Sequence, residues 1–390
     1  MADSISVDVV CKAFAGGSLA LDEVSLSVEP GTFVVLLGPS GSGKTTLLRC
    51  LAGIEHVTSG QIAIGGKTVA GGQVHVPPDR RNLSMVFQDY ALWPHLRVRE
   101  NVAFALRRSK LTRTEAQART LAMLERVGLG ALADRYPNEL SGGEQQRVAL
   151  ARALVAGTGL ILCDEPLSNL DADLRERMRV EISSLVREAG ATAVYITHDQ
   201  AEAFALADQI GVLQKGRLIQ FGRPEEVYTR PASPFVARFT GLAGELPVRV
   251  TGQAPGPGAS GPRASGPRAS GPGASSPDAA LPDSAIEVDV AGPALLRPFR
   301  ARAGHHLAGA DALLLIRPTG VRLSGTHNGD HHLAGVVADV AFRGRGYEHA
   351  IDIPGHGRLT GVFAATRAER GETVGLRLEP AGCHVFSATA

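Results

Sequence analysis

The chain has 390 residues, of which 44% are hydrophobic and 20% charged, and this composition predicts a folded protein of two or three domains. A formal net charge of +1 provides no strong positive field to hold a polyanion, so we expect no nucleic-acid partner. No apolar stretch approaches the ~20 residues of a membrane-spanning helix, and the first residues lack the pattern of a signal peptide. The four cysteines are far apart, without CxxC spacing, which argues against a disulfide framework or a zinc knuckle.

The amino-terminal part of the chain alternates between apolar strands and helical patterns. Residues 24–28 alternate between apolar and polar side chains, as on a half-buried strand. Residues 33–37 form a continuous apolar run before a glycine-rich turn, which is typical of a buried parallel strand. Similar runs at 160–163 and 193–196 precede helical patterns, and residues 113–127 have the period of an amphipathic helix. This order predicts an α/β fold with a mostly parallel sheet.

The composition and the hydrophobic pattern of the sequence change in the last third of the chain. Residues 253–283 are almost entirely Gly, Pro, Ala and Ser, a composition that predicts a disordered insertion because it has no apolar face to bury. Short β-like runs follow, with Gly and Pro between them and no helical period. We therefore predict an α/β domain at 1–240 and a small all-β domain, of the OB-barrel kind, at 241–390 that contains the insertion.

The first motif that carries chemistry is G-x-x-x-x-G-K-[ST], at residues 38–45. Glycines allow backbone N–H groups to wrap around phosphates, and the following helix presents its amino terminus to the same anion. Lys44 is predicted to reach the β- and γ-phosphates and the Thr45 hydroxyl to bind Mg²⁺. The motif follows an apolar strand, as it must, and chance would give only about 0.01 matches in a chain of this composition. The predicted ATP-binding residues here are Gly38, Pro39, Ser40, Gly41, Ser42, Gly43, Lys44, Thr45 and Thr46.

The second motif is an apolar run that ends in two carboxylates, Asp164 and Glu165. The carboxyl edge of an open α/β sheet is where such folds bind ligands. Asp164 is therefore a candidate for the Mg²⁺ shell. Glu165 is the candidate general base that polarises the attacking water.

The third motif, LSGGEQQR at 140–147, resembles the signature sequence of ATP-binding cassette proteins. Ser141 and Glu144 have the spacing of a helix capping box, and two glycines that we expect to be exposed add bare N–H groups for a second anion. In the family this second site faces the ATP held by the opposite protomer, so the resemblance implies a homodimer. The implied signature residues are Leu140, Ser141, Gly142, Gly143 and Glu144.

The remaining cassette motifs match in order, and their roles are implied by the resemblance. Phe14 stands where the family stacks an aromatic ring on adenine, and Gln88 stands at the glutamine of the coupling loop, a Mg²⁺ ligand that senses the nucleotide and the membrane subunit. His198 follows a strand, where the family places the histidine that contacts the γ-phosphate. A helical subdomain is implied at about 89–155. The loop that links the protomers corresponds to Ser168, Asn169, Leu170 and Asp171.

The resemblance covers residues 1–240, and the carboxy-terminal domain is similar to the regulatory TOBE-like barrel of importer ATPases for ferric iron, polyamines, sulfate and sugars. The segments 316–323 and 333–351 carry that similarity, and 75–106 looks most like the ferric-iron branch. The resemblance implies an MgATP-hydrolysing importer subunit on the cytoplasmic face of the cell membrane. It implies two membrane permease subunits and a separate extracytoplasmic substrate-binding protein as partners.

Three other functions remain open from the sequence. The solute is alternatively a polyamine, phosphonate, sulfate or sugar. A soluble cassette ATPase of DNA repair or translation is the alternative of another class, although no second cassette, coiled coil or zinc insertion is evident. A non-catalytic ATP-binding regulator is disfavoured by the presence of Glu165 and His198.

Two further features lie outside the nucleotide motifs. Residues 89–96 place large side chains, including the only tryptophan, in one short loop, which we interpret as the membrane-coupling surface; the alternative is that Leu92 and Trp93 are core residues. Eight histidines follow residue 300, and we expect solvated loop side chains and not a metal cluster. They are His305, His306, His327, His331, His332, His349, His356 and His384.

Overall fold

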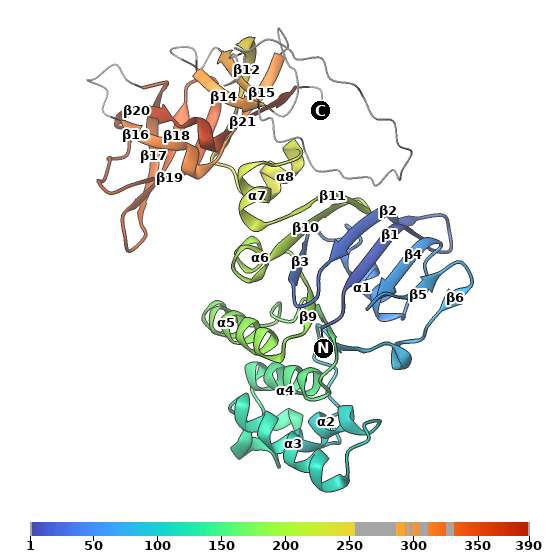
Figure 1. Ribbon diagram of the computed structural model, residues 1–390. Coiled ribbons are helices and arrows are strands. Elements are labelled where there is room, and N and C mark those ends of the chain that lie inside the picture. The colour runs from blue at the N-terminus through green and yellow to red at the C-terminus, as the bar shows by residue number, and fades with distance from the viewer. Residues whose placement is uncertain are drawn as a thin grey trace, which may run out of the picture. The chain divides into compact units, whose positions relative to one another are not determined.

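The computed structural model describes residues 2–253, 286–292, 295, 299–303, 311–324 and 331–388. These residues form two compact units, Met1–Val227 and Tyr228–Ala390, which run from blue to green and from yellow to red in Figure 1. The second unit therefore begins before the boundary that we expected at 240/241. Among the residues described, no helix is long and apolar enough to cross a membrane.

A six-stranded sheet forms the centre of the first unit, with the order β11-β10-β3-β9-β8-β7. The strands from β7 to β10 in this order are parallel, and β11 is antiparallel to β10. All residues of β3, β8 and β9 are buried, which explains their continuous apolar runs. The mostly parallel sheet is thus confirmed. The strands are β3 (Phe33–Leu37), β7 (Leu83–Val86), β8 (Leu160–Asp164), β9 (Thr192–Thr197), β10 (Gln209–Gln214) and β11 (Arg217–Gly222).

A second, antiparallel sheet has the order β2-β1-β4-β5-β6. One continuous apolar core joins side chains of β1, β2 and β4 to helix α1 (Lys44–Ala52) and to strands β3, β8 and β9. Helix α1 is consequently fixed by packing against both sheets, and this packing holds the glycine-rich loop that precedes it. The strands are β1 (Ile5–Ala13), β2 (Leu19–Val28), β4 (Ser59–Ile64), β5 (Lys67–Gly71) and β6 (Val74–His75).

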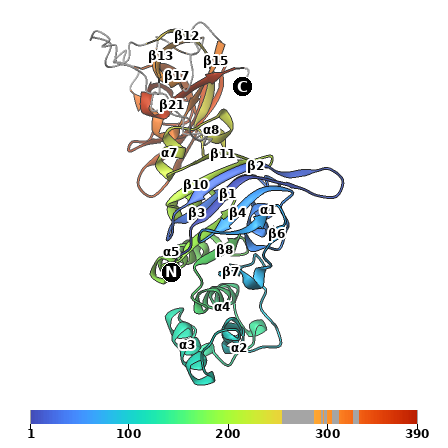
Figure 2. The same ribbon diagram turned by 45° about the vertical axis from the view of Figure 1, so that its right-hand side comes forward.

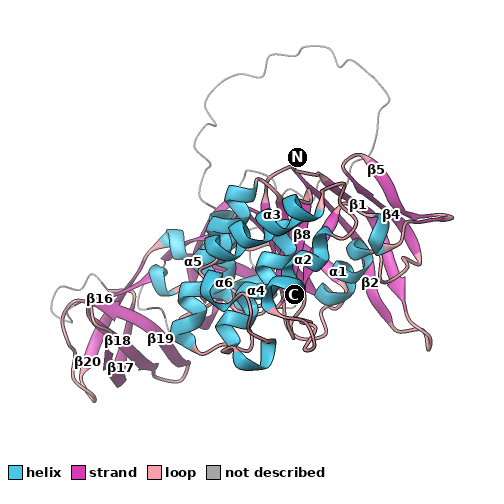
Figure 3. Cartoon of the chain, turned by 90° about the horizontal axis from the view of Figure 1, so that it is seen from below, coloured by secondary structure: helices cyan, strands magenta, loops and turns pink. Residues whose placement is uncertain are grey.

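Helices α2 (Val98–Ala103), α3 (Arg113–Arg126) and α4 (Gly142–Val155) gather on the side of the six-stranded sheet away from α1 and the antiparallel sheet (Figures 1 and 2). The amphipathic helix expected at 113–127 is α3, which begins at a capping box made by Thr112 and Glu115. Seen from below, these helices and α5 lie in front of the strands (Figure 3). The other elements of the unit are α5 (Ala172–Ala189), α6 (Gln200–Leu206) and the 3₁₀ turns Pro78–Arg80, Phe104–Leu106, Gly130–Leu132 and Pro137–Glu139, and the boundary between the units lies within α7 (Pro224–Thr229).

The second unit contains a closed barrel, β12-β13-β14-β21-β15, and a five-stranded antiparallel sheet, β16-β20-β17-β18-β19. Both share one apolar core, so the predicted all-β barrel domain is confirmed. Gln253 still pairs with Val288, so strand structure continues one residue into the predicted insertion; residues 254–283 lie outside the described part of the chain. The elements are α8 (Pro234–Phe239), β12 (Gly244–Gln253), β13 (Ile286–Ala291), β14 (Phe299–Ala303), β15 (Asp311–Ile316), β16 (Val321–Ser324), β17 (Leu333–Phe342), β18 (Tyr347–Ile353), β19 (Gly357–Ala364), β20 (Thr373–Leu378) and β21 (Cys383–Ser387), with 3₁₀ turns at Pro318–Gly320 and Pro380–Gly382.

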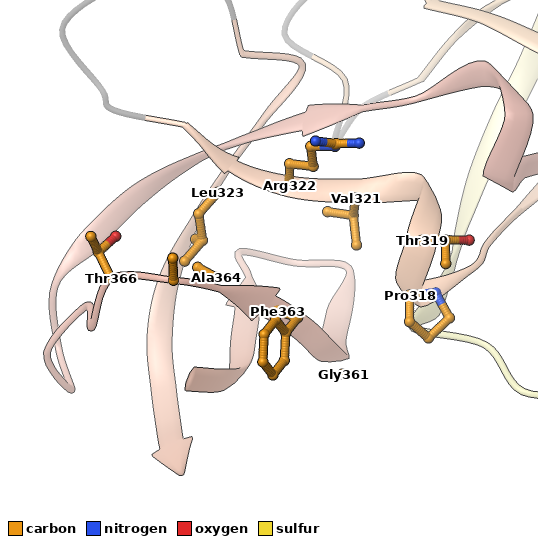
Figure 4. Close-up of a pocket in the computed structure, with 10 residues that line it drawn as sticks. Pro318, Thr319, Val321, Arg322, Leu323, Gly361, Phe363, Ala364 and Thr366 are labelled. Atoms are coloured by element: carbon orange, nitrogen blue, oxygen red, sulfur yellow. The ribbon is translucent and has the colours of Figure 1, made fainter. Parts of the chain in front are cut away.

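A groove of about 530 Å³ lies between strands β16 and β19 of this sheet (Figure 4). Val321, Arg322 and Leu323 line it from β16, and Phe363 and Ala364 line it from β19. Arg322 is the one charged side chain among the lining residues, and Thr319 and Thr366 add two hydroxyl groups.

The expectation of solvated histidines is wrong for His349 and His384, which are buried on strands β18 and β21. Ala368 N–H donates to Nε2 of His349 at 3.1 Å, and Nδ1 of the same ring lies 3.2 Å from the backbone oxygen of Val362, so both ring nitrogens have partners in the core. Burial, with Arg317 and Arg302 nearby, lowers the pKa of His384 to about 4. His305, His306 and His327 lie outside the described residues.

Arg317 explains why the second unit begins at Tyr228. Its side chain is 1% exposed, and its guanidinium donates to the backbone oxygens of Tyr228, Ala237 and Gly241 at 2.8, 2.8 and 2.6 Å. The guanidinium carbon also lies 4.3 Å from the centre of the Tyr228 ring. These bonds attach α8 and its flanking turns to the β domain.

We predict that Arg317→Met lowers the free energy of unfolding of this unit by about 2–4 kcal/mol, because three carbonyl oxygens lose a charged donor. The matched control is Arg322→Met, whose side chain is 73% exposed and which is expected to change stability by less than about 0.5 kcal/mol. Calorimetric unfolding of both full-length variants is the measurement. Equal stability of the two variants would contradict the role of Arg317.

Candidate nucleotide-hydrolysis site

The glycine-rich loop between β3 and α1 has the geometry of a phosphate cradle. Gly43 caps α1 with φ 102°, a left-handed conformation that favours glycine. A Cβ at Gly38 would lie 2.4 Å from the backbone oxygen of Leu213, so only glycine fits there. Lys44 Nζ donates to the backbone oxygens of Gly38 and Pro39 at 2.8 and 3.0 Å, which folds the ammonium group over its own loop. The residues of the sequence motif are therefore held together as predicted for an anion site.

Polar groups in the loop are buried to a degree that suits a charged ligand. Lys44 is 4% exposed, and burial lowers its pKa, although the nearby Glu165 and Asp164 partly oppose that effect. The hydroxyl oxygen of Ser42 is buried without a hydrogen-bond partner in the described structure. An ammonium group and an unsatisfied hydroxyl beside a helix amino terminus fit a phosphate group.

Asp164, the last residue of β8, faces the same loop. Its Oδ1 accepts a hydrogen bond from the Thr45 hydroxyl at 3.3 Å, and the residue is 7% exposed. Burial raises the pKa of Asp164, while the bond from Thr45 acts in the opposite direction. A carboxylate and a hydroxyl oxygen side by side are the kind of ligand that Mg²⁺ prefers. The two residues thus fit the metal role that we predicted for them.

Glu165 and His198 come together at the carboxyl ends of neighbouring strands. The Glu165 Oε2 and His198 Nδ1 atoms are 3.2 Å apart. Glu165 has φ 44°, and holding the backbone of a non-glycine residue in this left-handed region costs on the order of 1–3 kcal/mol. A cavity of about 30 Å³ adjoins the pair, lined also by Ser168, Arg175, Thr197, Asp199 and Glu202. Strain of this kind, next to a polar cavity, is typical of a functional site.

Gln88 lies beside these groups because β7 and β8 are parallel neighbours. It follows β7 by two residues and is exposed. Its backbone oxygen accepts a hydrogen bond from Asn169 Nδ2 at 3.0 Å, while the Ser168 hydroxyl donates to the backbone oxygen of Glu165 at 3.0 Å. The loop at 168–171 therefore connects Gln88 to the candidate base, and Asp171 caps α5 through a bond from Leu174 N–H at 2.9 Å.

The signature segment begins helix α4 with the expected capping box. Glu144 Oε2 accepts bonds from the backbone N–H and the hydroxyl of Ser141, both at 2.8 Å, and these bonds lower the pKa of Glu144. Gly142 is exposed as predicted, but the prediction is wrong for Gly143, which is buried. A Cβ at Gly143 would lie 2.8 Å from the side chain of Leu174, so this glycine permits close packing of α4 on α5.

Phe14, the predicted adenine platform, lies just after β1 and is 42% exposed. The Lys12 ammonium nitrogen is 4.8 Å from the centre of its ring. The ring is therefore open to a stacking partner, as the prediction requires.

Sequence reasoning missed three side chains that hold the site loops. Asn101 and Arg152 bond to the loop after Gln88, and Arg175 donates to the backbone oxygen of Leu170 at 2.9 Å. A signal was present for Arg152, since it is the one charged residue in the apolar helical run 148–156. Such a charge is buried only when it is paired or hydrogen-bonded.

The fold and the site define a P-loop nucleotide-hydrolysing domain joined to a β-barrel domain. Comparison with known families matches residues 21–168 to the ABC transporter family and residues 314–386 to the TOBE domain. Fe(3+) ions import ATP-binding protein FbpC of Brucella abortus (strain 2308) is 53% identical over 247 residues, which is 63% of this chain and 69% of that protein. The protein with the same description from Agrobacterium fabrum is 51% identical over 250 residues, 64% of this chain and 69% of its own length.

Other similar proteins extend the comparison. Spermidine/putrescine import ATP-binding protein PotA of Thermobifida fusca is 48% identical over 246 residues, 62% of this chain and 63% of that protein. A dimeric ATP-binding cassette solved with ADP and Pi is 32% identical with a TM-score of 0.50, covering 56% of this chain and 98% of that chain. The cbiO1 structure from Clostridium perfringens is 29% identical with a TM-score of 0.53, covering 57% of this chain and 89% of that chain.

The chain belongs to the family of ABC transporter ATP-binding proteins. It combines the ATP-binding domain of that family with a TOBE domain, and it is an ATPase of the ABC type.

We predict that Glu165→Gln lowers ATP hydrolysis by roughly 10²–10⁴-fold while ATP still binds, because the amide keeps the size of the side chain but cannot accept the proton. Glu188→Gln on the exposed end of α5 is the matched control, and its activity is expected to be unchanged. Phosphate release and equilibrium nucleotide binding are the two measurements. Turnover of Glu165→Gln close to that of the unmodified chain would refute the role of Glu165 as general base.

Proposed function

We propose that the chain is the MgATP-hydrolysing homodimeric subunit of an importer, and that it powers solute uptake through two separate membrane permease subunits. A separate extracytoplasmic binding protein delivers the solute, and the chain acts at the cytoplasmic face of the cell membrane. The observation that carries this proposal is the strained Glu165 beside His198, next to the Thr45–Asp164 pair and the lysine of the phosphate loop.

The geometry supports a division of labour in hydrolysis. The loop N–H groups and Lys44 bind and orient the β- and γ-phosphates, and Thr45 and Asp164 hold Mg²⁺, with Gln88 as a further ligand. Bound Mg²⁺ neutralises charge on the phosphate oxygens. Glu165 accepts the proton of the attacking water, while His198, 3.2 Å from the Glu165 carboxylate, contacts the γ-phosphate and fixes the position of that carboxylate.

The dimer is proposed because the start of α4 is a second anion site. Ser141 and Gly142 are exposed at the amino end of α4, and a helix amino terminus attracts an anion. In the proposed dimer this end faces the ATP of the other protomer, and the loop at 168–171 lies at the contact between the two chains. That loop bonds to both Gln88 and Glu165, so closure of the dimer acts directly on the hydrolytic groups.

The loop at 89–96 is proposed as the surface that binds the permease subunits. Asp89, Ala91, Pro94 and His95 are exposed, and Trp93 is half-buried with its ring centre 4.0 Å from that of Phe104. Both interpretations of Trp93 therefore have a basis: one part of the ring packs on the helical group and the other remains open. A partly exposed aromatic ring beside exposed loop residues suits a helix-in-groove contact.

Ferric iron is the proposed solute, because the relatives at 51–53% identity are described as Fe(3+) import ATP-binding proteins. A polyamine is the second candidate, supported by the spermidine/putrescine import relative at 48% identity. Phosphonate, sulfate and sugar remain alternatives from the sequence. The residues that choose the solute belong to the proposed binding protein and permeases, so the site in this chain is common to all of these possibilities.

A deletion strain is expected to grow poorly on limiting ferric iron and normally on limiting polyamine, phosphonate or sulfate. Complementation with the unmodified gene restores growth, and complementation with Glu165→Gln does not, because hydrolysis powers uptake. Growth rates and uptake of labelled iron are the measurements. A defect confined to another nutrient would replace iron by that nutrient, and no defect on any of them would refute the importer.

A further inference from the structure

The loop after Gln88 is held in an unusual backbone conformation. Tyr90 and Ala91 are adjacent residues with φ of 63° and 43°, both in the left-handed region. Neither is glycine, and a residue with a Cβ adopts this region only where its surroundings impose it. Contacts from outside the loop must therefore hold these two residues in place.

Arg152 of helix α4 supplies the main contacts. Its Nη1 donates to the backbone oxygen of Ala91 at 2.6 Å, and its Nη2 donates to that of Tyr90 at 2.7 Å. The residue is 8% exposed, and its guanidinium carbon lies 5.0 Å from the centre of the Trp93 ring. One planar group thus fixes both left-handed peptides and supports the next aromatic side chain.

Two more contacts hold the ends of this loop. Asn169 binds the backbone oxygen of Gln88 at 3.0 Å, from the loop that precedes α5. Asn101 of α2 is fully buried, accepts a bond from Trp93 N–H at 2.9 Å and donates to the Trp93 oxygen at 3.1 Å. Of these three residues, only Arg152 lies in α4, the helix that begins at the signature segment.

We propose that Arg152 is a positioning residue that ties the signature helix α4 to the Gln88 loop by holding Tyr90 and Ala91 in the left-handed conformation. The inference rests on the proposed function in that Gln88 serves hydrolysis and Trp93 faces the permease. A shift of α4 on ATP binding then moves the coupling loop with it. Arginine is required because its fork presents two donors in one plane, whereas a lysine ammonium is a single point.

Trp93 is the one tryptophan in the sequence, so the chain carries its own reporter of this loop. The test measures Trp93 emission and hydrolysis while MgATP is added to the full chain. In the unmodified chain we expect an ATP-dependent change in emission. In Arg152→Lys we expect that change to fall at least fivefold and kcat to fall about tenfold, with KM for ATP within about twofold because Arg152 contacts none of the predicted nucleotide ligands.

Arg81→Lys is the matched control. Arg81 is 6% exposed and donates to the backbone oxygens of Val76, Cys50, Leu51 and Val69 at 2.8, 2.7, 2.5 and 3.1 Å, so it is as buried and as strongly bonded as Arg152 but does not touch the Gln88 loop. It is expected to melt at a lower temperature and to keep the Trp93 response. Equal loss of response in both lysine variants would show a general effect of destabilisation and overturn the proposal.

Changes at Ala91 test the same idea without altering a buried charge, because Ala91 is exposed. Ala91→Gly removes the cost of the left-handed conformation. When it is combined with Arg152→Lys, we expect kcat to be at least threefold higher than in Arg152→Lys alone. Ala91→Val raises that cost and is expected to weaken the Trp93 response in a chain that keeps its melting temperature, so the test stands even if Arg152→Lys does not fold.

Several results would overturn the role of Arg152 separately from the proposed function. The first is an unmodified chain that hydrolyses ATP with no change in Trp93 emission. The second is a normal kcat and a normal Trp93 response in Arg152→Lys, and the third is the absence of any effect of the two Ala91 substitutions. An unmodified chain that binds but never hydrolyses ATP, even with permease subunits present, would instead refute the proposed function.

Discussion

The parallel register of β3, β7, β8 and β9 is the constraint on which the hydrolytic site depends. Because these strands run in the same direction, their carboxyl ends meet at one edge of the sheet, and each is followed by a residue of the proposed site. Gln88 follows β7, Asp164 and Glu165 stand at the end of β8, His198 follows β9, and the phosphate loop follows β3. Segments more than a hundred residues apart in sequence thereby meet at one small site, and complete burial of β3, β8 and β9 keeps that edge rigid.

Buried arginines give the loops around this frame their shape. Arg81, Arg152 and Arg317 are each less than 10% exposed, and all donate to backbone oxygens of loops or element ends. Burial lowers the pKa of Arg81 and of Arg317 to about 10 and lowers that of Arg152, yet each remains charged at neutral pH. A charged, forked donor to carbonyls forms strong, directional bonds, so these residues cross-link segments that are distant in the sequence.

Much of this arrangement was predictable from the sequence, and the reasons are local. Continuous apolar runs predicted the buried strands, and the spacing of Ser141 and Glu144 predicted the helix cap; the structure confirms both. The glycine-rich motif predicted a loop between a strand and a helix, and it lies between β3 and α1. The unpredicted features are tertiary. The burial of Gly143 depends on the approach of Leu174 from another helix. The His349 ring is contacted by Val362 of the neighbouring strand and by Ala368 of the loop that follows that strand. Neither contact leaves a periodic pattern, because the partners are set by packing and not by spacing.

A few hydrogen bonds, and not a large apolar interface, join the groups that we propose for hydrolysis. Gln88, Glu165 and the loop at 168–171 are connected by single bonds from Asn169 and Ser168 to backbone oxygens. Each such bond contributes only about 0.5–1.5 kcal/mol net, so the connections are strong enough to transmit a displacement and weak enough to rearrange within a catalytic cycle. Asp164 is the last residue of the buried strand β8 and Thr45 lies in the packed helix α1, whereas Gln88 is exposed on a loop that hydrogen bonds from Arg152 and Asn169 hold. In the proposed site, groups on packed elements hold the phosphate, and groups on loops complete the arrangement for hydrolysis.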